Sequence, residues 1–389
     1  MADKLKMSLD PNGEHIKLRW SKDDEPPSKP LRLKSEQLRV RSVDVREALN
    51  ALNSYVCTNQ KFEEEKDPRW RRYADVLRTL REKGEALHNA LLIQDDDPRS
   101  QEFMRAIEEL PQGAELWVIC SDDEVSLPLG FVFEGEVDTP VGKPSRSDFA
   151  GFWLDRFKIT MLVEGGGAGP ERRCVDPLSL KTLYALHRTE VDNAFPYLGS
   201  DATKLKQLTL LPVKDYYNWT AAKRACANIS NAESIVFVFA HSNGDYLYFS
   251  DSSVDCNTFR MHLHRDRSAS HPVLLILNCC LSVSGGEGGS LLSAAARKGF
   301  CGLVGTEAEI LNTYALRCGT RLMWELCFNG RPLGEALDAM QSAEDLFPLN
   351  LLYTCYAQRD FQLLKPIEPI EPIEPIEPID QRHEQLRAA

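Results

Sequence analysis

Two short apolar runs in the second half of the chain each end in a chemically capable side chain. Residues 234–249 read SIVFVFAHSNGDYLYF and reach His241, and residues 271–282 read HPVLLILNCCLS and reach Cys279 and Cys280. Short apolar runs bounded by turn residues are typical of strands buried on both faces of a parallel sheet. Because ligands bind beyond the carboxyl ends of such strands, the pattern predicts an imidazole and a thiol at one edge of a sheet.

Helical and strand patterns alternate on both sides of these runs. We expect strands at 114–120, 302–305 and 350–358, a strand pair at 150–164, a Gly-rich loop at 282–289, and helices at 214–229, 290–298, 310–328 and 334–344. Helices that alternate with apolar strands at this spacing predict an α/β fold with a mostly parallel sheet flanked by helices.

Composition divides the chain into four segments. Residues 1–41 are polar and rich in Pro and Lys, which predicts a loose lead-in. Residues 42–110 have apolar positions at helical spacing and are expected to form a helical module. Residues 111–364 carry the α/β pattern. Residues 365–389 hold a Pro-Ile-Glu repeat, whose period of three favours an extended polyproline II tail outside the fold.

Charge and hydropathy exclude some classes of partner. The formal charge of −12 argues against nucleic acid and against an anionic membrane surface as the main partner. The first residues lack the apolar segment of a signal peptide, and no run approaches the 18 apolar residues of a membrane span. We therefore expect a cytoplasmic protein.

The cysteines and glycines indicate neither a metal nor a bound cofactor. The eleven cysteines are odd in number and scattered, which is more typical of reduced thiols than of a disulfide framework. The sequence has no Cys-x-x-Cys pair, and His262 and His264 have no further ligands nearby. GGGAGP at 165–170 is not followed by Lys-Ser/Thr, so a phosphate loop is not expected.

The spacing between His241 and Cys280 suits two neighbouring strands. Cys280 follows His241 by 39 residues, which leaves room for one crossover helix, expected at 255–264. A thiol attacks a carbonyl as the thiolate, and an imidazole can take its proton and later pass it to the leaving amine. A buried free cysteine is otherwise a small hydrophobic side chain, so a purely structural thiol is the alternative.

Several short motifs follow one another in a recognisable order. They are SLPLG at 126–130, LNCCLS at 277–282 and GGEGGSLLSAAARKGFCGLVGT at 285–306. The series closes with a predicted helix that contains Ala315, followed by an Asn-Gly pair that ends at Gly330 and by the Ala-Leu pair Ala336 and Leu337. Together they resemble the CHAT family of caspase-like cysteine peptidases, which is related to separase and the caspases. The resemblance extends from about Ala114 to Leu364 and implies a caspase-like peptidase domain at 111–364.

This resemblance implies a Cys-His dyad. Cys280 would be the nucleophile, and His241 would act as general base and general acid. Cys279 stands where the family usually has Ala, and neighbouring strand residues point to opposite sides, so Cys279 is expected to pack under the site. The oxyanion hole would use the backbone N–H of Cys280 and that of Ser242 or Gly244 in the turn after the histidine.

Two positions depart from the family pattern. The family commonly has Gly directly after the histidine, where this chain has Ser242, and it has a polar residue after the nucleophile, where this chain has Leu281. The first departure leaves two candidates for the oxyanion amide, and the second bears on specificity. A degenerate, inactive member of the family is therefore an alternative.

Acidic residues near the predicted site bear on substrate preference. Relatives of separase type place an acid after the strand that follows the cysteine, and Glu309 matches that position best. A carboxylate in the first specificity pocket (S1) would select Arg or Lys. Asp245, near the histidine turn, is the second candidate. Alternatively, Glu307 and Glu309 are solvated loop charges or acids at the start of the next helix.

The leading hypothesis is a cytosolic cysteine endopeptidase that cuts a protein substrate, with cleavage after a basic residue as one option. The resemblance also implies activation by a regulatory protein partner or ligand, a prokaryotic defence or cell-death-like system, and gasdermin-like substrates. Residues 42–110 would then be the sensing or docking part. The main alternative is a silent caspase-like scaffold, and the third is a thiol-dependent hydrolase or acyltransferase of small molecules.

Overall fold

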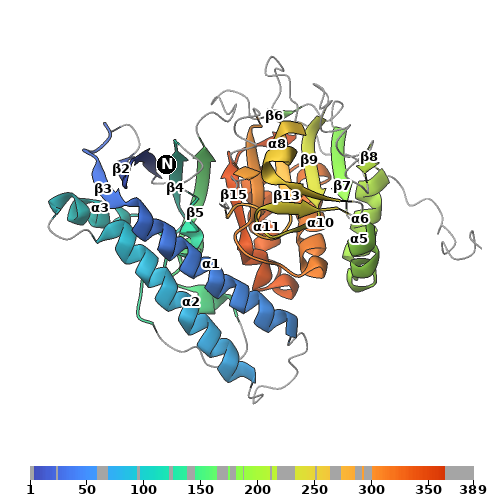
Figure 1. Ribbon diagram of the computed structural model, residues 1–389, viewed down its shortest axis with the longest axis horizontal. Helices are drawn as coiled ribbons and strands as arrows, with labels where there is room; N and C mark the ends of the chain where they lie inside the picture. The colour runs from blue at the N-terminus through green and yellow to red at the C-terminus, as the bar shows by residue number, and fades with distance from the viewer. Residues whose placement is uncertain are drawn as a thin grey trace, which may run out of the picture.

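The computed structural model describes residues 4–22, 25–58, 69–93, 97–121, 126–137, 145–163, 174–175, 181–186, 188–210, 213–216, 233–249, 252–262, 273–284, 291–292 and 300–363. The Gly-rich segment 165–170, most of 285–298, His264 and the repeat tail 365–389 lie outside these residues. Two main sheets lie next to each other, and helices surround them (Figure 1).

The first sheet has five strands in the order β3-β2-β1-β4-β5. Its strands are β1 (Lys4–Asn12), β2 (His15–Lys22), β3 (Leu31–Lys34), β4 (Ala114–Cys120) and β5 (Phe157–Val163). Buried positions alternate with more exposed ones along β1 and β2, as in strands with one face on a core. The predicted loose lead-in at 1–41 was therefore wrong, because its apolar residues have the period of two that supplies a sheet face.

This sheet joins segments that the sequence prediction had separated. β1 pairs with β2 in an antiparallel ladder and with β4 in a parallel one. The predicted boundary at residue 111 consequently passes between strands of a single sheet. Strand β4 confirms the strand expected at 114–120.

Three helices pack on the first sheet. They are α1 (Ser35–Thr58), α2 (Arg69–Leu92) and α3 (Pro98–Glu108), and they confirm the helical pattern expected within 42–110. α1 and α2 lie side by side (Figure 1). Asp97 caps α3 by accepting the N–H of Arg99 at 3.0 Å. The buried residues of these helices belong to the same core as the strands.

The second sheet has six strands in the order β15-β14-β13-β9-β7-β8. Its strands are β7 (Lys181–Leu186), β8 (Val213–Tyr216), β9 (Glu233–Phe239), β13 (Leu274–Asn278), β14 (Gly302–Thr306) and β15 (Tyr353–Ala357). Neighbouring strands are parallel except β14 and β15. Every residue of β13 is buried. The predicted α/β class, with a mostly parallel sheet flanked by helices, is confirmed.

Helices and smaller elements complete the described fold. The helices near the second sheet are α5 (Arg188–Ala194), α6 (Asp201–Leu210), α8 (Cys256–His262), α10 (Asn312–Cys327) and α11 (Leu333–Gln341) (Figure 1). β10 (His241–Ser242), β11 (Tyr246–Tyr248) and β12 (Ser253–Asp255) form a small sheet, and β6 (Cys174–Val175) pairs with β16 (Gln362–Leu363). Short helices lie at α4 (Trp153–Arg156), Leu129–Phe131, Arg146–Phe149, Phe195–Tyr197, Glu344–Leu346 and Leu349–Leu352.

One sequence prediction of local structure was wrong, and so was the start of another. Residues 214–216 of the helix expected at 214–229 belong to β8, where pairing with β7 overrides the local helical spacing, and residues 217–229 lie outside the described residues. The strand pair expected at 150–164 is the short helix α4 followed by β5 alone. A short run of large apolar side chains does not by its period distinguish a strand from a buried helical turn.

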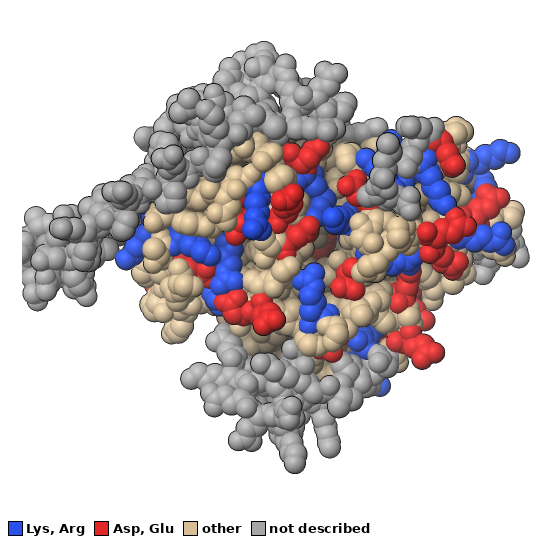
Figure 2. Space-filling view, turned by 180° about the vertical axis from the view of Figure 1, so that it is seen from behind, with Lys and Arg blue, Asp and Glu red and all other residues tan. Residues whose placement is uncertain are grey.

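The described surface carries both charge signs (Figure 2), and the described cysteines form no disulfide with one another. Acidic and basic side chains are interspersed on the face shown in Figure 2, without a continuous basic stripe among the described residues. No helix in the described part of the chain is long and apolar enough to cross a membrane. The cysteine side chains that the structure describes form no disulfide, and the described residues contain no group of three or more His, Cys, Asp and Glu arranged for a metal.

Candidate active site

His241 and Cys280 follow the ends of two paired parallel strands. β9 and β13 are neighbours, and their last paired residues are Phe239 and Asn278. His241 lies two residues beyond Phe239, and Cys280 lies two residues beyond Asn278. Both candidate residues therefore lie at the same edge of the sheet, as the apolar runs predicted.

Cys280 is held by the backbone of a nearby loop. Its Sγ donates to Ile310 O at 3.4 Å and accepts the Ile310 N–H at 3.3 Å. Burial raises the pKa of the Cys280 thiol, the charge of Glu309 adds to the rise, and the hydrogen bond from Ile310 opposes it. The thiol is therefore neutral at pH 7. Cys279 is buried in the core, at the packing position expected for it.

His241 contacts a carboxylate and an amide. Its Nε2 lies 3.0 Å from Glu190 Oε1 and 3.2 Å from Asn312 Nδ2. An ionised carboxylate can only accept hydrogen bonds, and Asn312 Nδ2, which can only donate, already donates to Glu190 Oε2. The shorter contact with Glu190 therefore favours a proton on Nε2, and the 3.2 Å approach of Asn312 Nδ2 to Nε2 is then a packing contact and not a hydrogen bond. In a neutral ring, Nδ1 is then the basic nitrogen.

One short segment contacts both candidate groups. Ile310 binds Cys280 Sγ, and Asn312, two residues later, contacts His241 Nε2. Asn312 is the first residue of α10. Asn278 Nδ2 donates to Ala315 O at 2.8 Å and so fastens the first turn of α10 to the end of β13. The loop and helix that follow β14 thus determine the surroundings of both groups.

α1 holds the same loop from the other side. Asn50 Oδ1 accepts the Glu309 N–H at 2.7 Å, and Asn53 Oδ1 accepts the Leu311 N–H at 3.2 Å. Cys57, one turn further along α1, also bonds Asn53 through its Sγ. Burial raises the pKa of Cys57 to about 11. The negative charge that Cys280 would carry if ionised adds to this rise.

A buried ion pair anchors α1 to the start of the loop. Arg46 Nη2 lies 2.9 Å from Glu307 Oε2, and the side chain of Glu307 is 0% exposed. Arg46 Nη2 also donates to Ser126 O and Ser126 Oγ, both at 3.0 Å. Tyr356 Oη donates to the other oxygen of Glu307 at 3.4 Å. The interpretation of Glu307 as a solvated loop charge was therefore wrong.

The residues expected to serve the oxyanion hole lie against the cysteine turn. Gly244 has a φ of +91°, and a Cβ built there would lie 3.7 Å from Leu281 Cβ and 3.4 Å from Ser284 Oγ. Its N–H donates to Ser242 Oγ at 3.0 Å. Leu281 itself has a φ of +54°, a left-handed conformation that strains a residue with a side chain. Its N–H donates to Ala308 O at 3.2 Å.

The two acidic candidates differ in their surroundings. Glu309 is exposed, and its charge acts on the Cys280 thiol. Asp245 is partly buried, and its Oδ1 makes no hydrogen bond with any residue that the structure describes. Both acids lie in loops that reach the candidate site, whereas Glu307 is committed to its ion pair with Arg46.

Sequence reasoning did not identify five residues that shape this site. They are Glu190, Asn312, Arg46, Asn50 and Asn53. The last three recur at helical spacing, so they mark one polar face of a predicted helix. That spacing is the one signal that could have found them. Glu190 has no comparable signal, because its contact with His241 arises only when β7 and β9 pair.

Comparisons with known proteins identify the fold. No family model and no curated protein match the chain. A crystal structure of the Saccharomyces cerevisiae separase–securin complex, at 3.0 Å resolution, is similar with a TM-score of 0.51 and 8% identity, over 93% of this chain and 30% of that chain. A second structure of that complex, at 2.6 Å, has a TM-score of 0.44 and 8% identity, over 92% and 30%.

The likeness concerns architecture. This chain spans about a third of the separase chain that it matches. At 8% identity, the similarity shows the fold and leaves activity, substrate and partners to be proposed from the site. The chain has a mixed α/β fold that resembles the caspase-like fold of separase.

Proposed function

We propose that the chain is a cysteine endopeptidase of the CHAT type, in which Cys280 attacks the substrate and His241 transfers the proton. The observation that carries this proposal is the segment from Ile310 to Asn312, which contacts Cys280 at one end and His241 at the other. Both side chains also follow strand ends that are paired in register. A caspase-like fold supports the same chemistry.

The proposed reaction has two steps. His241 takes the proton of the Cys280 thiol, and the sulfur forms a bond with the carbonyl carbon of the scissile peptide. The proton then passes to the leaving amine as the C–N bond breaks, and water hydrolyses the thioester. The backbone N–H groups of Cys280 and of Ser242 or Gly244 would stabilise the oxyanion. In this structure the Gly244 N–H donates to Ser242 Oγ, so the oxyanion would take the place of that hydroxyl as the acceptor of the Gly244 N–H.

The state of the thiol supports regulated activity. Its raised pKa keeps Cys280 neutral, and the Ile310 backbone occupies its sulfur. Such a thiol needs a rearrangement of the loop before it meets a substrate. We therefore propose activation by a protein partner; separase, for comparison, is found in a complex with securin. A cytoplasmic role in prokaryotic defence or cell death, with a gasdermin-like substrate, is the setting that the CHAT resemblance favours.

The acids beside the site support a basic substrate residue. Glu309 is exposed, and its charge reaches the Cys280 sulfur. A carboxylate on the loop that contacts the nucleophile would attract the Arg or Lys that precedes the scissile bond. Asp245 is the second candidate for the same pocket because it follows the histidine turn.

One observation favours a silent scaffold as the second candidate. His241 Nε2 contacts Glu190 and Asn312, while the Cys280 sulfur contacts the Ile310 backbone. Each group of the dyad thus has other partners in this structure. A chain that kept this arrangement permanently would bind partners through a caspase-like fold and cleave nothing.

Peptide cleavage by matched variants separates the two. The full chain and its Cys280→Ala, His241→Ala and Cys301→Ala variants are incubated with a peptide library made by digesting a cell lysate, and new termini are identified by mass spectrometry. Cys301 is the control because it is a partly exposed cysteine directly before β14, beside the start of β13, whereas Cys280 follows the end of β13. We expect cleavage by the wild type and Cys301→Ala alone. Equal cleavage by Cys280→Ala contradicts the proposal. No cleavage by any chain, even after undigested lysate is added as a source of the proposed activating partner, favours the scaffold.

A further inference from the structure

A third side chain joins the two strand-end groups at the candidate site. We infer that Glu190 is a positioning residue for His241, and that Asn312 holds the Glu190 carboxylate in place. This inference rests on the proposed protease function. Among the described contacts, Glu190 Oε1 lies 3.0 Å from His241 Nε2, and Asn312 Nδ2 donates to Glu190 Oε2.

Strand register brings the three groups together. Leu186, the last residue of β7, pairs with Phe239 of β9, which in turn pairs with Asn278 of β13. Glu190 follows Leu186 by four residues, whereas His241 and Cys280 each follow their strand by two. An acid, an imidazole and a thiol therefore follow the ends of three adjacent parallel strands, at the same edge of the sheet.

The contact defines what each ring nitrogen can do. The carboxylate accepts the Nε2 proton, so a neutral His241 keeps its lone pair on Nδ1. With this tautomer fixed, Nδ1 can accept the thiol proton directly, because the ring does not first have to move its own proton from one nitrogen to the other. Asn312 donates to the second carboxylate oxygen, and this prevents the acid from turning away from the ring.

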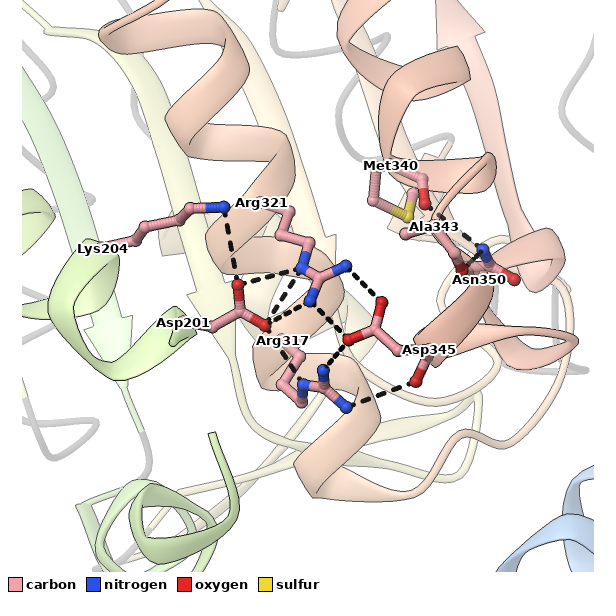
Figure 3. A network of polar contacts seen from close by, with 8 residues as sticks. All are labelled: Asp201, Lys204, Arg317, Arg321, Met340, Ala343, Asp345 and Asn350. Atoms are coloured by element: carbon pink, nitrogen blue, oxygen red, sulfur yellow. Dashed lines mark hydrogen bonds and ion pairs between the residues drawn. The ribbon is translucent and has the colours of Figure 1, made fainter. Parts of the chain in front are cut away.

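α6, the α-helix that follows the helix of Glu190, is fastened to α10 by a network of charged side chains (Figure 3). Asp201, the first residue of α6, is 0% exposed and lies 3.1 Å from Arg317 Nε and 2.9 Å from Arg321 Nη2. Asp345 accepts from both arginines on their other side. α10 also supplies Asn312, whose amide donates to the Glu190 carboxylate.

The opposite role for Glu190 is that of a restraint. In that case the carboxylate would hold the imidazole away from Cys280 and would suppress activity until it is displaced. The two roles predict opposite effects of removing the carboxylate. Their geometry is the same, so kinetics must distinguish them.

The test compares Glu190→Ala and Glu190→Asp with a matched control. Glu325→Gln is the control, because Glu325 is 17% exposed and pairs with Arg331 at 3.1 Å, while Glu190 is 20% exposed. For Glu190→Ala we expect kcat on the best library peptide to fall about 100-fold with KM nearly unchanged. Glu190→Asp should recover part of that loss, and Glu325→Gln should match the wild type.

The histidine tautomer gives a second readout that does not depend on cleavage. Nitrogen-15 NMR of histidine-labelled protein reports which ring nitrogen carries the proton, and the spectrum of His241→Gln identifies the resonances of His241. We expect the Nε2–H form in the wild type and a mixture in Glu190→Ala. An unchanged tautomer, or activity of Glu190→Ala equal to or above that of the wild type, overturns the inference.

Failure of the proposed function has a different signature. If Cys280→Ala cleaves as the wild type does, the protease assignment is lost whatever the spectra show. If the wild type depends on Cys280 and Glu190→Ala retains full kcat, only the role of Glu190 is lost.

Discussion

Arg46 and Glu307 form a buried ion pair across 261 positions of sequence, with Arg46 Nη2 2.9 Å from Glu307 Oε2. The pair ties a helix packed on the first sheet to the loop that follows β14 of the second. The same loop contacts Cys280 through Ile310. The N-terminal helices are thus mechanically connected to the candidate nucleophile.

Removing one partner of this pair should destabilise the fold strongly. Arg46→Ala leaves a buried carboxylate whose remaining described partner is Tyr356, and we expect a loss of about 3–5 kcal/mol in the free energy of unfolding. The double variant Arg46→Met, Glu307→Leu should lose less, because neither charge is left alone. Urea unfolding measures both.

A surface pair provides the control for that experiment. Arg331 and Glu325 are 3.1 Å apart, and the Arg331 side chain is 46% exposed, so Arg331→Ala should cost no more than about 1 kcal/mol. A similar small loss for Arg46→Ala would show that the buried pair does not hold α1 to the loop.

The reactivity of Cys280 should increase with pH. Burial raises the pKa of its thiol, and iodoacetamide reacts with the thiolate, so alkylation should be slow at pH 7 and rise through a midpoint above the usual value of about 8.5. Cys57, whose pKa is raised to about 11, should follow at higher pH. Peptide mapping by mass spectrometry separates the two thiols. A plateau for Cys280 already reached below pH 7 would indicate a preformed thiolate and contradict this prediction.

The two asparagines of α1 should stabilise the loop beside the thiol. Asn50→Ala with Asn53→Ala removes the acceptors of the Glu309 and Leu311 N–H groups. We expect the free energy of unfolding to fall by about 1 kcal/mol for each lost hydrogen bond. Cys280 should also be alkylated faster, because the loop that covers its sulfur loosens.

Asn329→Ala is the corresponding control. Asn329 donates to Glu325 at an exposed position in the turn after α10, so its loss should leave Cys280 alkylation unchanged. Equal alkylation rates in all three proteins would show that α1 does not restrain the loop.

Substrate preference should depend on Glu309. Glu309→Gln removes a negative charge near the nucleophile, and we expect kcat/KM for peptides with Arg or Lys before the scissile bond to fall about tenfold or more. Glu344→Gln, at an exposed position in the short helix Glu344–Leu346, should leave the preference intact. Cleavage after Asp or apolar residues by the wild type would contradict the role given to Glu309.

The sequence predicts the candidate dyad because apolar patterning and chemistry coincide there. β9 and β13 are buried strands with an unmistakable composition, and a parallel pair must end on the same side. Cys279 could be assigned to the core by the same alternation. The strands β1 and β2 were missed because their polar alternate residues lower the average hydropathy, although their period of two was present.

The remaining parts of the site depend on tertiary docking. Arg46, Asn50 and Asn53 mark a helical face, but the sequence does not indicate what that face meets. Glu190 lies in a seven-residue helix after a strand whose own pattern was not readable. Its partner His241 is 51 positions away, and only the order β7-β9-β13 makes them neighbours.

The parallel pairing of β1 with β4 has a practical consequence for dissecting the chain. β1, which precedes the helical segment, pairs directly with β4, which follows it. Removing the residues before position 41 or 110 would therefore remove β1 and leave one edge of β4 unpaired. Exposed edges recruit other strands and aggregate. The N-terminal helices and the sheet that carries the candidate site should therefore be separated by point substitutions in their contacts, because truncation would damage both.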